Sequence, residues 1–463
     1  MSTVGNSGAT LDRSRPPRPG PAPNIRLPSY QRIVLANGLT VLTVRHDGIP
    51  EVSARLVVSF GATDDPANRS GTALLVARAL TEGTTRRSAR QVAESLDFLG
   101  ARLTVDVTHD ASVLSLQFLS RVFDSALDLL AEIVTQPAFD DAEVERLRDE
   151  RLDEIASGLD EPRIVANNRL IEAIFGRHTY ALNEGGVEET VRAIDSAGLR
   201  AFHGSFYRPR SAALVLVGDV PKPSRLEERL QAAFGDWVGE PATPQAMVDA
   251  EKATGRRFWI VQWPGPQSEI RVGGIGISRL DEEYPAVIVM NAILGGLFSS
   301  RMNMKLREEK GWTYGVRSWF DARKNRGPYS VATAVEAQAT AEAVGEILHE
   351  IERLKSEPPT LEELELAKNS LTFSLPRLFE TVSQVAGRVS QQVVYGLPDD
   401  YSTTHIDRVR AVTLTDVLEA AERHLDSHRA AIVVVGPATD FHADLGSFGT
   451  VEVRDIRGRP AVL

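Results

Sequence analysis

The feature that most constrains the fold of this chain is an internal repeat with a constant offset. The apolar run AALVLVG ends at Gly218, and a similar run, AIVVVG, ends at Gly436, which is 218 positions later. The alternating segment at 268–277 likewise lies about 218 positions beyond the one that starts near Glu51. Because a fixed offset between similar segments indicates duplication of a whole unit, we expect two similar domains in the 463 residues.

Each half combines alternating strand-like segments with amphipathic helices. RIVLANGLTVLTVRH has two apolar runs joined by Ala-Asn-Gly, which predicts a β-hairpin. SARQVAESLDFLGA begins with a serine cap and ends at a glycine, which predicts a helix. The expected fold class is therefore α+β, with two homologous domains, each a mostly antiparallel β-sheet packed with α-helices on one face.

Composition places the boundaries of these domains. Residues 1–27 are rich in proline and predict a disordered extension. The segment 238–255 is rich in Pro, Ala and Gly and predicts a linker. We therefore expect an N-terminal domain at 28–237 and a C-terminal domain at 256–463.

Charge and cysteine content exclude several classes of function. The net charge of -11 and pI near 5.5 argue against nucleic acid and anionic membranes as partners, because both need a positive field. The chain has no cysteine, which excludes disulfides, thiolate nucleophiles and Cys-ligated metals. It shows neither the apolar core of a secretory signal nor a long uninterrupted apolar run. We expect a soluble cytoplasmic protein, with a periplasmic location left open.

Several segments, in this order and spacing, resemble the pitrilysin or insulinase-type zinc peptidases, which include the mitochondrial processing peptidase. The similarity covers nearly all of residues 30–450. It rests on the segments NGLTVLTV, FGATDDPANRSG, TEGT, YRPRSAALVLVGDV, PGPQSEIRVGG, ILGGLFSSRMNMKLREEKGWTYGV and SLPRLFETVSQVA. The resemblance implies the two-domain fold of processing peptidases.

The resemblance also implies where a zinc site would lie, and this chain lacks its ligands. Active members carry HxxEH on the first helix, where two histidines one turn apart bind zinc and the glutamate acts as general base. Those three positions are Leu74, Ala77 and Arg78 here, whereas Glu154 matches the third ligand. One carboxylate cannot hold zinc, so we expect no metal in this chain. Glu154 is expected to pair with Arg78 or to lie on a solvated helix.

Other candidate sites are weaker. His424 and His428 are four residues apart and could share a helical face, although such a pair near a helix end is usually solvent-exposed. His178 is expected to make a loop hydrogen bond, and His349 to lie on a helix surface. The sequence contains no GxSxG elbow, Walker loop or dinucleotide fingerprint after a strand.

The second half retains a pair that the family uses on the substrate side. Members of the family carry an arginine and a tyrosine seven residues apart, which reach across the chamber to the peptide, and here these are Arg307 and Tyr314. A guanidinium can bond peptide carbonyls and a phenol can donate to an oxyanion, so the resemblance implies substrate contacts. The alternative is structural, with Arg307 pairing with Glu308 or Glu309 and Tyr314 packing at a strand start.

These observations predict the non-catalytic subunit of a heterodimeric zinc metallopeptidase. The expected partner is a homologous subunit that carries HxxEH and the zinc, and the expected substrate is a peptide. Two alternatives stay open. The chain could be an inactive scaffold, like the core proteins of a respiratory complex that resemble this family, or a peptide-binding homodimer of the same fold.

Overall fold

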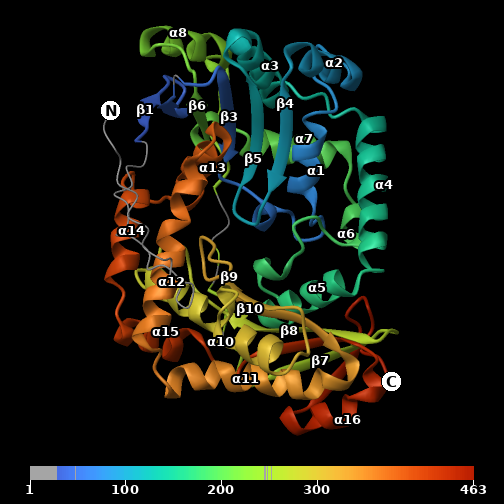
Figure 1. Cartoon of the computed structure of the whole chain (residues 1–463). Coiled ribbons are helices and arrows are strands. Elements are labelled where there is room, and N and C mark those ends of the chain that lie inside the picture. The colour runs from blue at the N-terminus through green and yellow to red at the C-terminus, as the bar shows by residue number, and fades with distance from the viewer. Residues whose placement is uncertain (1–28, 47, 244–246, 248, 252, 463) are drawn as a thin grey trace, which may run out of the picture.

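The computed structural model describes residues 29–462 except 47, 244–246, 248 and 252. The expected disordered extension at 1–27 lies outside the described residues, as does part of the expected linker. Two six-stranded sheets form the two halves of the molecule, one above the other in Figure 1.

The first sheet is built from residues 31–218 in the order β1-β2-β6-β3-β5-β4. Only the β2–β6 pair is parallel, and the other neighbours are antiparallel. The predicted hairpin through Ala-Asn-Gly is confirmed as β1–β2. The strands are β1 (Gln31–Val34), β2 (Thr40–Arg45), β3 (Glu51–Val58), β4 (Arg102–Val107), β5 (Ser112–Leu119) and β6 (Ala212–Gly218).

The second sheet repeats this plan in the order β12-β7-β11-β8-β10-β9. From β7 to β9 the order matches that from β2 to β4, element for element, which confirms the expected α+β fold with two homologous halves. Only its outer edge differs, because β12 pairs in parallel with β7 whereas β1 pairs antiparallel with β2. The strands are β7 (Arg257–Gln262), β8 (Gln267–Ile275), β9 (Val316–Phe320), β10 (Pro328–Glu336), β11 (Ala431–Gly436) and β12 (Val451–Arg454).

Helices fill the connections in both halves. Several begin at capping boxes, such as Ser88 with Gln91 at α2 and Thr381 with Gln384 at α13. The first half contains α1 (Thr72–Ala79), α2 (Ala89–Leu99), α3 (Phe123–Thr135), α4 (Asp141–Gly158), α5 (Pro162–Phe175), α6 (Glu188–Arg192), α7 (Ser196–Phe206) and α8 (Pro223–Phe234). The second half contains α9 (Tyr284–Asn291), α10 (Arg301–Asn303), α11 (Thr340–Ser356), α12 (Leu361–Phe373), α13 (Val382–Tyr395), α14 (Tyr401–Ala411), α15 (Leu414–His424) and α16 (His442–Leu445).

The two halves exchange equivalent helices, which corrects the expectation of helices on one face only. Helix α13 of the second half packs on β3 and β6 of the first sheet, and α5 of the first half packs on β8 and β11 of the second. Figure 1 shows α13 running up beside the upper sheet and α5 lying on the lower one. Each sheet is therefore covered on both faces, once by a helix from the other half.

The central strands explain this exchange. Every residue of β6 and of β11 is buried, whereas a strand with one solvated face would alternate. On β6, Leu214 and Leu216 face the core shared with α1 and α3, and Val215 and Val217 face α13. The continuous apolar runs AALVLVG and AIVVVG thus already carried a signal for a sheet that is covered on both faces.

Two arginines fasten the exchanged helices at equivalent positions. On β3, Arg55 donates from Nη2 to the main-chain oxygen and Oγ of Ser383 on α13, at 3.1 and 3.2 Å. On β8, Arg271 donates from Nε to Asn167 Oδ1 on α5, at 2.6 Å, and from Nη1 to Glu269 Oε2, at 2.8 Å. Both the arginines and their helix partners are 216 positions apart in sequence. The duplication is therefore preserved in individual side-chain contacts.

We expect Arg271→Ala to lower the free energy of unfolding by about 3 kcal/mol, because it leaves the half-buried carboxylate of Glu269 and the side-chain oxygen of Asn167 without their donor. Arg271 is only 2% exposed. The equivalent change Arg55→Ala is expected to cost at most about 2 kcal/mol, since Arg55 bonds only neutral oxygens of Ser383. Urea unfolding of both variants measures the difference, and equal losses would contradict this account.

One helix of the second half is long and apolar enough to cross a membrane by length and composition alone. It runs from Tyr284 to Glu309 and includes α9 and α10. It is not an uninterrupted apolar run, because Asn291, Ser299, Ser300 and Arg301 lie within it. Within its most apolar stretch 56% of the residues are buried in the protein, and Met290, Leu294 and Met302 belong to the core of the second half. In the structure it packs as a core helix.

Because of two half-buried histidines, we expect the free energy of unfolding to fall in mild acid. Burial lowers the pKa of His203 to about 4, and burial together with Arg279, Arg408 and Arg388 lowers that of His405 to about 4, from 6.5 in each case. Between these values the unfolded chain binds protons that the folded protein does not, so stability is lost as pH falls from about 6.5 to 4. We expect a loss of about 2 kcal/mol per histidine at pH 5.

His203→Gln is expected to remove about half of this loss between neutral pH and pH 5, as followed by urea unfolding at each pH. The control is His46→Gln, at an exposed position. An unchanged pH dependence in His203→Gln would refute the assignment.

Candidate functional site

The helix at the degenerate zinc position begins in a tightly held turn. Gly71 has φ 99, and its N–H and that of Ala73 donate to the carboxylate of Asp65 at 2.6 and 2.7 Å. A Cβ on Gly71 would lie 2.9 Å from the main-chain oxygen of Gly185. The turn therefore needs glycine, and a buried carboxylate caps the free N–H groups at the start of α1.

The positions that correspond to the metal ligands lie on α1 as the spacing predicts, but their chemistry is different. Leu74 and Arg78 are one turn apart and are the partly exposed residues of this helix, whereas Ala77 is completely buried in the first core. Arg78 donates from Nη1 and Nη2 to the two carboxylate oxygens of Glu154 on α4, at 2.9 and 3.1 Å. Glu154 was expected either to pair with Arg78 or to lie on a solvated helix, and the structure shows the pair with Arg78.

Glu154 is held by two cations. Its second oxygen also accepts from Arg151 Nη1 at 2.9 Å. Burial alone would raise the pKa of Glu154, but the guanidiniums of Arg78 and Arg151 lower it overall. The carboxylate therefore stays ionised and fully engaged with arginine.

These residues do not fit the zinc ion that the family resemblance implies. A catalytic zinc site needs three protein ligands that carry lone pairs; Leu74 has none and Arg78 brings a positive charge, while Ala77 also lacks the carboxylate of the general base. Among the described residues no group of three or more His, Cys, Asp or Glu is arranged to hold a metal ion. The first half thus has the helices that carry the zinc site in active relatives, but an ion pair between Arg78 on α1 and Glu154 on α4 stands in place of the metal ligands.

The histidine candidates do not form a second metal site in the described part of the chain. Helix α15 ends at His424, so His428 lies beyond it and the two do not share a helical face. His424 is 7% exposed rather than solvated, and its Nε2 lies 2.7 Å from Glu283 Oε2. His178 accepts the loop hydrogen bond expected of it, from the N–H of Tyr180 at 3.0 Å, and His349 lies exposed on α11.

Arg307 and Tyr314 lie at the surface of the second half, before the edge strand β9. Arg307 belongs to a π-helical turn, Met304–Glu309, and its guanidinium carbon lies 4.2 Å from the ring centre of Phe298. Its Nε is 3.4 Å from Glu308 Oε1, a pairing at the surface. Tyr314 is 95% exposed, so the alternative in which it packs at the strand start is wrong. Both polar ends are therefore available to a second molecule.

Asn303 fixes the segment that carries this pair, and sequence reasoning missed it. It is 4% exposed, donates from Nδ2 to the main-chain oxygen of Val316 at 2.8 Å and accepts from the N–H of Val316 at 3.1 Å. This two-bond contact ties the end of α10 to the start of β9. The available signal was a single amide between two methionines, in the run RMNMK.

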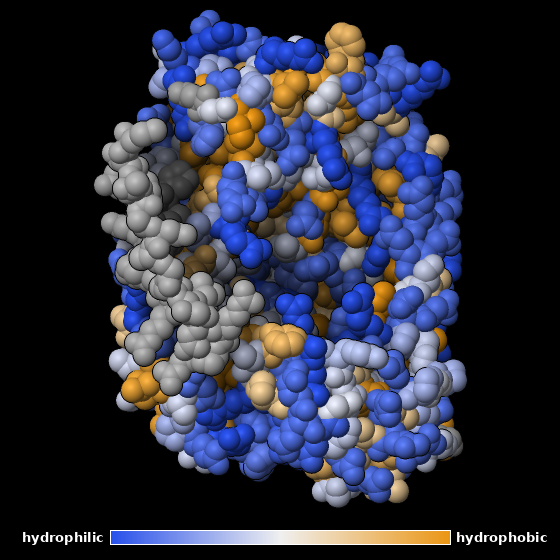
Figure 2. Space-filling model, in the orientation of Figure 1, coloured by the Kyte–Doolittle hydropathy of each residue, from blue (hydrophilic) through white to orange (hydrophobic). Residues whose placement is uncertain are grey.

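A cavity of about 990 Å³ lies next to the degenerate helix and was not predicted. Its walls come from α4, α5 and α6 of the first half and from the hairpin and C-terminal residues of the second, including Asp321, Arg323 and Arg457. Figure 2 shows a recess at mid-height on the face in view, between the two halves. Glu154 lines the cavity, so the former ligand position opens onto it.

The charges around this cavity largely neutralise one another. Six arginines and six carboxylates line it, and all of these carboxylates except Glu189 lie in ion pairs with arginine or with His109. The net charge of -11 is therefore not concentrated here, and the cavity gives no support to a preference for basic peptides.

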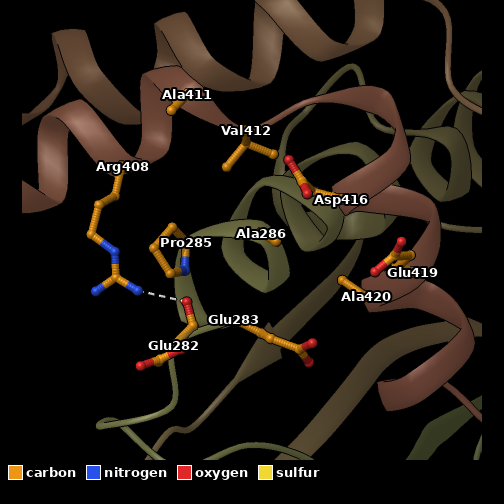
Figure 3. A pocket seen from close by; sticks show the side chains of 10 residues that line it. All are labelled: Glu282, Glu283, Pro285, Ala286, Arg408, Ala411, Val412, Asp416, Glu419 and Ala420. Atoms are coloured by element: carbon orange, nitrogen blue, oxygen red, sulfur yellow. Dashed lines mark hydrogen bonds between the residues drawn. The ribbon is translucent and has the colours of Figure 1, made fainter.

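A smaller pocket of about 290 Å³ lies between α9, α14 and α15, and Figure 3 shows its lining. Its carboxylates are mostly engaged. Glu283 contacts Arg423 and His424, and Asp416 caps α15 by accepting from Thr413. Arg408 reaches in to donate to the main-chain oxygen of Glu282 at 2.6 Å, the dashed line in Figure 3. The pocket alone shows no catalytic arrangement.

Two family models match consecutive parts of the chain, and the second match begins within the first half. Residues 40–184 match the model described as Insulinase (Peptidase family M16), and residues 193–371 match the model described as Peptidase M16 inactive domain. The chain is similar to an uncharacterized zinc protease of Mycobacterium tuberculosis, 28% identical over 91% of this chain and 96% of that one. An uncharacterized zinc protease of Bacillus subtilis is 23% identical over 88% of this chain and 98% of its own length.

Solved structures agree with these matches. The crystal structure of a peptidase M16 inactive domain from Pseudomonas fluorescens superposes with a TM-score of 0.83 at 28% identity, covering 88% of this chain and 98% of that one. A protease from Helicobacter pylori shares the fold with a TM-score of 0.77 at 19% identity, covering 88% of this chain and 100% of that one. Both halves and their arrangement are thus accounted for, and the chain belongs to the insulinase family of peptidases, family M16.

Proposed function

We propose that this chain is the non-catalytic subunit of a heterodimeric zinc metallopeptidase. The observation that carries the proposal is the contrast between its halves. The first half has an arginine–carboxylate pair where zinc would bind, whereas the second half presents a fully exposed phenol at Tyr314 and an accessible guanidinium at Arg307. A partner that carries HxxEH would supply the zinc, and this chain would supply the substrate-side groups.

Arg307 and Tyr314 have the chemistry for this role. A guanidinium donates to carbonyl oxygens of a bound peptide and orients it, and a phenol hydroxyl donates to the oxyanion that develops at the cleaved amide. The ring of Phe298 under Arg307 limits the positions that the guanidinium adopts. Tyr314 is 95% exposed, so its hydroxyl is accessible to a ligand.

The two sheets each leave an edge strand free for a peptide. β4 ends the first sheet beside α1, and β9 ends the second beside the segment that carries Arg307. An extended peptide can add to such an edge through main-chain hydrogen bonds. We propose that substrate binds in this way inside a chamber formed with the partner, and the cavity of about 990 Å³ supports this by showing space next to α4.

The proposal is tested by purifying the chain alone and with an HxxEH-bearing homologue from the same organism. Peptide cleavage, zinc content and size are measured for each protein and for the mixture. We expect this chain alone to be inactive and free of stoichiometric zinc, and the mixture to form a heterodimer that cleaves peptides faster than the homologue alone.

Two results would replace the proposal. If the chain cleaves peptides by itself, the assignment of Leu74, Ala77 and Arg78 to the three HxxEH positions is wrong. If the mixture neither assembles nor cleaves, the scaffold or the peptide-binding homodimer becomes the better account, and the size of the chain alone separates these two.

A further inference from the structure

The short loop before β9 carries Tyr314 and is held at both ends. At its start the N–H of Trp312 donates to the main-chain oxygen of Leu306 at 3.1 Å. At its end Asn303 makes the two bonds to Val316 described above. Tyr314 lies between these points and is 95% exposed. Because its ring has so little contact with this chain, the main chain of the loop determines where the phenol lies.

A tight turn encloses Tyr314 between its two neighbours in sequence. Thr313 Oγ1 accepts from the N–H of Gly315 at 3.1 Å and donates to the main-chain oxygen of the same residue at 3.0 Å. Thr333 reaches this turn from β10, the neighbour of β9 in the lower sheet of Figure 1. Its Oγ1 donates to Thr313 Oγ1 at 2.9 Å and also lies 3.1 Å from the main-chain oxygen of Gly315. Thr333 therefore contacts the middle of the loop, at both residues that flank Tyr314.

The position of Thr333 in the sheet shows that its hydroxyl is not there for packing. It is 4% exposed and lies in the same row of β10 as Val331 and Val335, which belong to the core of the second half. Valine has nearly the same shape as threonine and suits a buried strand at least as well. A hydroxyl in such a row needs a bonding partner, because burying it without one costs free energy. The partners of this hydroxyl lie in the loop that carries Tyr314.

The contact matters for a donor that must be placed accurately. In the proposed function, on which this inference rests, the Tyr314 hydroxyl donates to an oxyanion, and such a bond is effective only at about 3 Å. A displacement of about 1 Å in a catalytic group can slow a reaction by up to about 10². We infer that Thr333 is a positioning residue for Tyr314. Its buried hydroxyl holds the turn formed by Thr313 and Gly315, and this turn sets the place of the phenol.

Thr333→Val removes the hydroxyl and keeps the shape of the side chain. Thr313 and Gly315 keep their bonds to each other, so we expect the Tm to be maintained. In the heterodimer kcat is expected to fall about tenfold with KM nearly unchanged, since the phenol acts only in the transition state. Thr333→Ser keeps the hydroxyl and is expected to stay within about twofold of the natural chain. The matched control is Thr372→Val, which removes a buried hydroxyl that bonds the main-chain oxygen of Lys368 within α12.

Two further readouts separate positioning from a merely structural role. In the Tyr314→Phe background, Thr333→Val is expected to cause no further loss of kcat, because no phenol hydroxyl is left to position. Hydrogen exchange, followed by mass spectrometry on this chain alone, is expected to be severalfold faster over 313–316 in Thr333→Val. Thr333→Ser and Thr372→Val are expected to exchange there at the natural rate. The exchange readout does not need the partner subunit.

The outcomes distinguish this inference from the proposed function. If Tyr314→Phe leaves kcat unchanged, or no active heterodimer forms, the proposed function fails and the inference falls with it. If Tyr314→Phe lowers kcat but Thr333→Val does not, only the inference is overturned. It is also overturned if Thr333→Ser loses as much activity as Thr333→Val, if the losses of Thr333→Val and Tyr314→Phe add, or if exchange over 313–316 stays at the natural rate.

Discussion

Replacing Tyr314 with phenylalanine in the assembled heterodimer is expected to lower kcat by about 10²–10³. The change removes one hydroxyl, which in our proposal donates to the oxyanion that forms as the peptide is cleaved. A donor that acts only in the transition state affects kcat and kcat/KM together and leaves KM nearly unchanged. Since Tyr314 is 95% exposed and its ring packs on nothing that the fold needs, Tm is expected to stay the same.

Steady-state kinetics of the mixture, with size measured in parallel, decide this prediction. Tyr30→Phe is the control, because it also removes a phenol hydroxyl, one that donates to Asp399 at 2.6 Å on another part of the surface. An unchanged kcat in Tyr314→Phe would remove this residue from catalysis and favour the scaffold account. Loss of assembly would instead show that Tyr314 holds the partner, and activity lost for that reason would not support an oxyanion role.

Much of the fold could be predicted because the signals were local and appeared twice. Ala-Asn-Gly joins β1 and β2, a serine cap starts α2, and the apolar runs that end at Gly218 and Gly436 became equivalent central strands. These features depend on turn chemistry and on strand burial, which a sequence expresses directly. Because these features recur at a constant offset, the sequence also indicated that the two halves share one fold.

The exchange of α5 and α13 could not be predicted from those signals. Either helix could have covered the sheet of its own half with the same apolar face. No residue in either helix indicates which strand it packs against. The contacts that decide it, such as Arg55 with Ser383 and Arg271 with Asn167, join residues far apart in sequence. Buried central strands required a cover on both faces, but they did not say which half would supply it.

In the candidate site, too, residue types could be predicted from the sequence and contacts between distant segments could not. The loss of the two histidine ligands at Leu74 and Arg78 and of the general base at Ala77 was visible as residue types. The two-bond pairing of Arg78 with Glu154, in contrast, depends on the packing of α4 on α1. The pattern that suggested His424 and His428 as a pair failed because the helix ends at His424. Spacing identifies a shared face only while the helix continues.

The double variant Leu74→His with Arg78→His is expected to bind one zinc ion per chain, although the natural chain lacks a fitting site. Both positions are partly exposed and lie one turn apart on α1, and the side chain at 78 already points at the Glu154 carboxylate on α4. Two imidazoles and one carboxylate are a ligand set that zinc accepts, with water in the fourth place. Metal analysis after dialysis and the rise of Tm with added zinc measure the binding.

This variant is also expected to stay inactive, because Ala77 still stands where active relatives have the general base. The matched control adds Glu154→Gln to the same two changes and should lose most of the affinity, since a neutral amide is a poorer zinc ligand than a carboxylate. If the double variant folds but takes up no zinc, α1 and α4 do not hold these three positions in ligand geometry. If it binds zinc and the control loses it, the helix that now carries an arginine–glutamate pair has kept the geometry of a metal site while losing its chemistry.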